Sequence, residues 1–93
     1  MLDKIKNLTV NWQENGKLKI KEIKKHVLTK GAWSTLMFLY QEFDEKTKKY
    51  KEAKITIKRY RKRNGQYFLQ SKFNISSKAQ GFEIAKIINE WYN

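Results

Sequence analysis

Apolar and polar residues alternate along most of the first 75 residues, and this pattern predicts β-strands. The dipeptides Asn15-Gly16 and Asn64-Gly65 are the strongest turn signals, because both residue types tolerate the left-handed backbone of tight hairpins. Ile23 breaks the alternation, which indicates a bulge near Glu22. Strands are expected at residues 8–13, 17–29, 33–43, 53–62 and 66–75, with a lysine-rich loop at residues 44–52. The third of these is apolar on both faces, as a central strand is.

After residue 75 the period of the pattern becomes helical, which predicts a helix over residues 78–92. Ser77 is a suitable N-cap residue, and Gln80 follows three positions later, as in a capping box. Phe82 lies outside the apolar stripe of this helix, so we expect it to be exposed or to lie in a dimer interface. The stripe consists of Ile84, Ile87, Ile88 and Trp91. The fold class is therefore expected to be α+β, a single domain of residues 1–93 with four to five antiparallel strands followed by one C-terminal helix.

The register of the last hairpin decides which of its side chains share a face. A two-residue loop at Asn64-Gly65 would pair apolar residues with polar ones. A three-residue loop that begins at Arg63 separates them, so we predict that loop. The apolar face then lies in the core beneath the helix, and Tyr60 opposes Phe68 on the outer face. That outer face carries seven candidate binding residues: Lys54, Lys58, Tyr60, Lys62, Phe68, Gln70 and Lys72.

The formal net charge is +12, and it is concentrated in two blocks. Residues 17–30 hold six lysines and one glutamate, and residues 44–63 hold ten lysines or arginines and three acids. Such a charge on a small domain favours a polyanionic partner. A solvated lysine-rich surface without a specific partner is the alternative. No membrane partner is expected, because we find no basic amphipathic helix.

Aromatic rings among the lysines indicate which polyanion is bound. Bases of a single strand stack on flat rings such as Tyr60 and Phe68, while ammonium groups contact phosphates and amides reach base edges. A duplex hides its base faces and gains little from exposed rings. We therefore expect a non-catalytic protein that binds single-stranded nucleic acid, DNA rather than RNA, in transcription, replication or repair. The alternative for the two rings is that they pack under another strand or a partner chain.

The composition also excludes several kinds of site. The chain has no cysteine and a single histidine, His26, so a disulfide scaffold or a Cys/His zinc site is excluded. We expect no metal, no cofactor, no catalytic residue and no small-molecule substrate. The longest apolar run, residues 36–40, is far shorter than a membrane span, and the first ten residues lack the apolar stretch of a signal peptide. A cytoplasmic location, association with the nucleoid included, is expected.

One series of short motifs has a counterpart in a known family. Ile55-Thr56-Ile57-Lys58-Arg59-Tyr60 is followed by Asn64-Gly65, then by Ser71-Lys72 and then by Ile75-Ser76 before the helix. In this order the motifs resemble the positive-cofactor-four family of single-stranded-DNA-binding transcriptional coactivators, which are related to the plant Whirly proteins. The chain lacks that family's Pro-Gly before the last strand and its tryptophan early in the helix, and Lys58 stands where arginine is usual.

The resemblance covers about a third of the chain and implies more than the composition does. It implies a curved antiparallel sheet and single strands bound across it, with Lys58, Tyr60 and Lys72 at matching positions. It also implies a homodimer built partly from the helices, which is the arrangement in which Phe82 would lie at the dimer interface.

Two other functions are compatible with the sequence. A toxin-type endoribonuclease would use Arg59, Arg61 and Tyr67 to stabilise the developing phosphorane and to transfer protons. Such toxins usually open with helices, whereas this chain is expected to open with strands. A protein-interaction module for an acidic partner or a ribosomal site is the other alternative. Catalytic cleavage of RNA would identify the enzyme, and a lack of salt-sensitive oligonucleotide binding would favour the interaction module.

Overall fold

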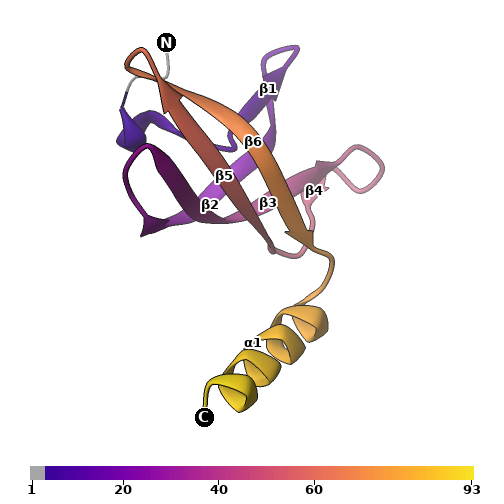
Figure 1. Cartoon of the computed structure of the whole chain (residues 1–93). Coiled ribbons are helices and arrows are strands. Elements are labelled where there is room, and N and C mark those ends of the chain that lie inside the picture. The colour runs from indigo at the N-terminus through magenta and orange to yellow at the C-terminus, as the bar shows by residue number, and fades with distance from the viewer. Residues whose placement is uncertain (1–3) are drawn as a thin grey trace.

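The computed structural model describes residues 4–93, which form a curled antiparallel sheet followed by one α-helix (Figure 1). The six-stranded sheet has the order β1-β2-β3-β5-β6, and the short β4 pairs with β3. The predicted α+β class is confirmed. The elements are β1 Trp12–Glu14, β2 Lys17–Thr29, β3 Trp33–Asp44, β4 Lys49–Tyr50, β5 Lys54–Arg63, β6 Gln66–Ile75 and α1 Lys78–Tyr92, with a 3-10 helix at Ile5–Asn7.

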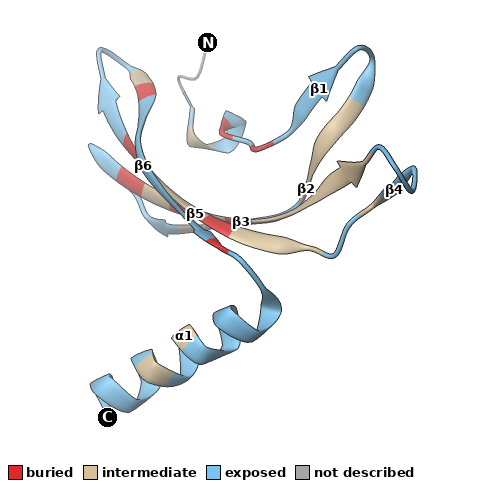
Figure 2. Ribbon diagram, turned by 90° about the vertical axis from the view of Figure 1, so that its right-hand side faces the viewer, coloured by how far each residue is buried: buried red, intermediate tan, exposed pale blue. Residues whose placement is uncertain are grey.

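Most of the predicted strands form where the alternation places them. β3 lies in the middle of the sheet, as its apolar pattern predicts. The pairing of β2 with β3 shifts between Glu22 and Lys24, which confirms the bulge predicted near Glu22. The lysine-rich segment expected to be a loop contains the two residues of β4. β1 begins later than expected, because residues 5–11 lie over one face of the sheet before the chain enters it (Figure 2).

The β5–β6 hairpin has a two-residue loop, so the predicted three-residue loop is wrong. Arg63 pairs with Gln66, and both Asn64 (φ 49°) and Gly65 (φ 77°) have the left-handed backbone that a tight hairpin requires. The register then shifts by one residue at Gln70 of β6, which leaves Gln70 unpaired as a bulge. This bulge, which the local pattern does not reveal, separates apolar from polar residues in a hairpin that would otherwise mix them.

The core lies on the inner side of the curl, which we call the concave face (Figure 2). Its buried residues on the sheet are Leu36, Phe38, Tyr60 and Tyr67. The opposite, convex face carries the apolar row of Met37, Ile57 and Phe73, which pair across β3, β5 and β6. The expectation of a core beneath the helix is therefore wrong, because the chain covers the concave face and leaves Phe73 exposed.

Residues 5–11, which we call the N-terminal arm, cover part of the concave face. Leu8 is fully buried there and Val10 nearly so. Lys25 holds the arm by donating from Nζ to the carbonyl oxygens of Lys6 (2.9 Å) and Leu8 (2.7 Å). The backbone nitrogen of Glu22 also donates to Oδ1 of Asn11, at 2.7 Å. The arm thus fills the part of the curl that the sheet alone leaves open.

Helix α1 has the predicted bounds and the predicted N-cap. The backbone nitrogen of Gln80 donates to Oγ of Ser77 (3.1 Å), while Oε1 of Gln80 accepts from the backbone nitrogen of Ser76 (2.7 Å). The helix lies on the convex side and packs little against its own sheet (Figure 2). Phe82 is 69% exposed and Trp91 is 81% exposed. Within residues 4–93, α1 included, no helix has the length and apolar character needed to cross a membrane.

Candidate functional site

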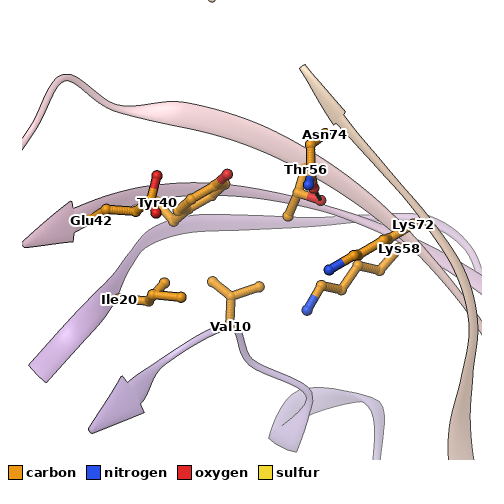
Figure 3. A pocket seen from close by; sticks show the side chains of 8 residues that line it. All are labelled: Val10, Ile20, Tyr40, Glu42, Thr56, Lys58, Lys72 and Asn74. Atoms are coloured by element: carbon orange, nitrogen blue, oxygen red, sulfur yellow. Dashed lines mark hydrogen bonds between the residues drawn. The ribbon is translucent and has the colours of Figure 1, made fainter. Parts of the chain in front are cut away.

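The concave face contains a hollow of about 240 Å³ beside the N-terminal arm (Figure 3). Val10 of the arm and Ile20 of β2 supply its apolar part. Strands β3, β5 and β6 supply its polar part. Every second residue of these strands faces the concave side, and near the hollow these residues are polar. These polar residues are Tyr40, Glu42, Thr56, Lys58, Lys72 and Asn74.

Lys58 and Lys72 are direct cross-strand partners, and both ammonium groups point into this hollow (Figure 3). Like charges in this position repel each other. Partial burial, and secondarily the charge of Lys72, lower the pKa of Lys58 below its ordinary value. Among residues 4–93 neither lysine forms an ion pair with a carboxylate. The pair is therefore a concentrated positive charge that an anion in the hollow would neutralise.

Neighbouring groups leave this positive charge uncompensated. Glu42 is the carboxylate of the hollow, and Lys54 lies 3.4 Å from its Oε1. Oγ1 of Thr56 donates to Oδ1 of Asn74 (2.6 Å), which leaves the side-chain nitrogen of Asn74 as a donor for a ligand. Burial, and secondarily Glu42, raise the pKa of Tyr40, so its hydroxyl is neutral and its ring lines the wall. The hollow thus combines two cations, a carboxylate that is paired with Lys54, neutral hydrogen-bonding groups and one aromatic ring.

Five of the seven candidate residues lie on the concave face. Four are lysines that project from it or line the hollow: Lys54, Lys58, Lys62 and Lys72. The fifth, Tyr60, is 5% exposed and belongs to the core. Its burial raises its pKa, with a smaller contribution from Glu22. The alternative of a packed ring is thus the one observed for Tyr60.

The other two candidates are displaced by the bulge. Phe68 pairs with Arg61 on the convex face, so it does not oppose Tyr60, whose partner is Leu69. Gln70 is the bulged residue itself. The predicted platform of two adjacent rings is therefore wrong, because it depended on a three-residue loop. Tyr40 was not selected from the sequence, because it lies within an apolar strand. Pairing that strand with β5, so that Tyr40 opposes Lys54, would have placed it on this face.

The three residues considered for an endoribonuclease do not come together. Arg59 and Arg61 project from the convex face, where Arg61 is paired with Trp33 and with Phe68. Tyr67 is buried on the concave face as the partner of Lys62. Because the sheet separates them, these three side chains cannot act on the same phosphate.

Comparisons of the chain with protein-family models, with curated proteins and with solved structures found no match.

Proposed function

We propose that this protein binds single-stranded nucleic acid without chemically altering it, and that a phosphate group occupies the concave hollow between Lys58 and Lys72. The cross-strand lysine pair is the observation that carries this proposal. Two unpaired ammonium groups facing each other reduce stability in the free protein, and a phosphate between them would convert repulsion into two charge-assisted hydrogen bonds.

The shape and lining of the hollow favour a single strand over a duplex. The cations lie inside a curl that is narrowed by the N-terminal arm, so a phosphate must enter the hollow to reach them. The Tyr40 ring at the other side of the hollow offers a stacking surface for an unpaired base, and Asn74 offers a donor for a base edge (Figure 3). A duplex keeps its bases stacked and presents only its outer backbone.

The resemblance to the positive-cofactor-four family supports the same proposal. Lys58 and Lys72 occupy matching positions in that resemblance, and both line the hollow. A curved sheet followed by one helix is also the arrangement that it implies. On this basis we propose DNA as the ligand, in transcription, replication or repair, and a cytoplasmic location near the nucleoid.

We further propose that the protein is a homodimer. The chain leaves two apolar surfaces uncovered on the same side: the convex row of Met37, Ile57 and Phe73, and the apolar residues of α1. Phe82 and Trp91 are both more than two-thirds exposed, which is unusual for aromatic rings of a monomer. A second copy has matching surfaces related by symmetry, so each helix would cover what the other chain exposes.

Binding to oligonucleotides of equal length, as single-stranded DNA, duplex DNA and single-stranded RNA, at two salt concentrations tests the central proposal. We expect single-stranded DNA to bind tightest, with an affinity that falls steeply as salt rises. Equal affinity for the duplex would reject the preference for single strands. Absence of binding at low salt would reject the function, and cleavage of the RNA would favour the endoribonuclease.

A pair of double variants locates the site. The double variant Lys58→Gln/Lys72→Gln should lower the salt slope by about 0.7, because the two lysines share one phosphate of the single strand. Lys78→Gln with Lys86→Gln removes the same charge from α1, outside the hollow, and should leave the slope nearly unchanged. Equal effects of the two double variants would mean that net charge alone holds the nucleic acid.

The dimer is tested by light scattering of the wild type and of Phe82→Glu. We expect the wild type to have twice the mass of the chain, and the variant to dissociate because a carboxylate would be buried at the interface. Lys78→Glu is the matched control, since it adds negative charge at an exposed position of the same helix. A monomeric wild type at micromolar concentration would reject the dimer.

A further inference from the structure

A second cluster of cations and aromatic side chains lies on the convex face, on the opposite side of the sheet from the hollow. Trp33 of β3 is the direct cross-strand partner of Arg61 of β5, and Arg59 lies two residues away on the same face. The guanidinium carbons of Arg59 and Arg61 lie 4.3 Å and 5.0 Å from the centroid of the Trp33 ring. Both distances are within the range of cation–π contacts.

The two guanidinium groups are held in place but remain free to bind an anion. Among residues 4–93 neither arginine forms an ion pair with a carboxylate or a side-chain hydrogen bond. Stacking on Trp33 fixes part of each side chain, so less conformational entropy is lost when a ligand binds. The N–H edges of a stacked guanidinium stay available for the bidentate recognition of a phosphate. Trp33 itself is 38% exposed, so the cluster is open to solvent.

The cluster lies outside the surface that we assign to the dimer. It is in the half of β5 that leads to the Asn64-Gly65 loop, whereas α1 follows the opposite end of the hairpin (Figure 1). A second copy that covers α1 and the apolar row would therefore leave Arg59 and Arg61 accessible.

The edge strand β6 is all that separates this cluster from the hollow. Lys72 points into the hollow, while its neighbour Ser71 pairs with Arg59 on the other face. Ser71, the small residue opposite Arg59, leaves Arg59 open towards the edge of the sheet, whereas the Phe68 ring lies opposite Arg61. Arg59 and Lys72 thus lie close to each other on opposite faces of the sheet, beside the same edge.

We propose that Arg59 and Arg61, stacked on Trp33, bind phosphodiester groups of a nucleic acid strand that leaves the hollow and bends over the β6 edge. This inference rests on the proposed function, because it concerns the continuation of the same strand. Positions two apart on a β-strand are about 6.6 Å apart, so each guanidinium can take a separate phosphate. Short strands would occupy only the hollow, and longer strands would contact both faces of the sheet.

Oligonucleotides of two lengths test the bend directly. A strand of about 4 nucleotides and one of about 16 span the range of site sizes seen for single-strand-binding sheets. We compare three proteins: the wild type, the double variant Arg59→Gln/Arg61→Gln, and the control double variant Lys78→Gln/Lys86→Gln. For the long strand, the arginine variant should lower the salt slope by about 1.4 and weaken binding about 25-fold at 0.1 M salt, because two phosphate contacts are lost. The short strand should bind both variants as it binds the wild type.

The possible outcomes separate this inference from the proposed function. Failure of the wild type to bind either strand rejects the proposed function, and this inference with it. Normal binding of the short strand with no loss for the long strand rejects the bend alone. Equal loss for both strands also rejects the bend, because it would mean that the arginines act only through the general positive field. A glutamate-rich peptide is added as a further ligand. If the arginine variant binds both strands normally but binds this peptide less tightly than the wild type does, the bend is rejected and the cluster belongs to a protein partner instead.

Fluorescence of Trp33 gives a second, structural measurement. In a Trp12→Phe and Trp91→Phe background, Trp33 is the only tryptophan left. The long strand should change its emission as phosphates engage the guanidinium groups on the ring, and the short strand should not. A response to neither strand, or the same response to both, would contradict the path over the β6 edge.

Discussion

In our account, Lys58 and Lys72 reduce the stability of the free protein and increase its affinity for a phosphate group. Their charges face each other across β5 and β6, and partial burial makes the protonated form of Lys58 still less favourable. A neutral side chain at either position would avoid the repulsion between the two charges. In our account the arrangement is stabilised only when an anion occupies the hollow.

Replacing Lys58 with methionine should therefore stabilise the free protein and weaken its binding. Methionine keeps the length of the side chain and removes the repulsion, so the free energy of unfolding should rise by about 0.5–1 kcal/mol. Urea denaturation at neutral pH measures that change, and oligonucleotide titration measures the affinity. A variant that loses stability would contradict the repulsion, and one that keeps full affinity would contradict the phosphate contact.

The same substitution should have an effect that depends on pH. Because folding lowers the pKa of Lys58, its protonation opposes folding, and the penalty is fully present below the folded pKa. It disappears as pH rises through the folded pKa towards the unfolded value of about 10.4. The stability advantage of Lys58→Met over the wild type should shrink across this window. A constant advantage at all pH values would point to packing instead of charge.

Tyr60 tests the boundary between core and binding surface. Its ring is packed with Leu36 and Phe38 on the concave face, so Tyr60→Ala should lower the free energy of unfolding by about 3–5 kcal/mol. Tyr60→Phe keeps the ring and should stay close to the wild type in both stability and affinity. If Tyr60→Ala were fully stable and only its affinity fell, the ring would be a stacking surface and not part of the core.

At the scale of elements, Lys25 bonds the middle of the N-terminal arm to the sheet. Lys25→Met removes the donor to the carbonyls of Lys6 and Leu8 but keeps the apolar stem, so the arm should open about 1.5–3 kcal/mol more easily. Hydrogen exchange of amides 5–11 measures this opening. Lys24→Met is the control, because Lys24 is an exposed residue without such bonds. Equal exchange in both variants would mean that the packing of Leu8 and Val10 and the bonds to Glu22 hold the arm without Lys25.

The elements themselves could largely be predicted from the sequence, because the signals that form them are local. The bounds of β2, β6 and α1 follow from alternation, from the Asn-Gly turns and from the Ser77 cap. The bulge at Gln70 could not be predicted, since it depends on matching Ile57 with Phe73 at the far end of the hairpin. That one residue moved Phe68 to the other face.

The candidate site could be predicted only in part, for the same reason. Lys58 and Lys72 were placed on one face correctly, because the loop is one residue shorter than predicted and the bulge at Gln70 adds one residue back before Lys72. Tyr60 was placed on the correct face, but it is buried in a core cluster to which the N-terminal arm, from a distant part of the sequence, contributes Leu8 and Val10. Contacts of this kind are tertiary, and no local pattern reveals them.

At the scale of the whole molecule, we assign the hollow to the concave face of the sheet, and the dimer interface and the arginine cluster to the convex face. The concave face holds the core, the arm and the hollow. The convex face carries an apolar region next to α1 and the arginine cluster near the hairpin loop. A small domain buries a small share of its surface, and a dimer through the convex side would bury more.

Mapping the bound strand by nuclear magnetic resonance tests the central claim most directly. Amide and lysine side-chain shifts of isotope-labelled protein are followed while a short single-stranded DNA is added. We predict that the largest changes occur at Lys58, Lys72, Tyr40 and Asn74, the residues that line the hollow. Changes concentrated on α1 or on the convex apolar row, with the hollow unaffected, would contradict the account.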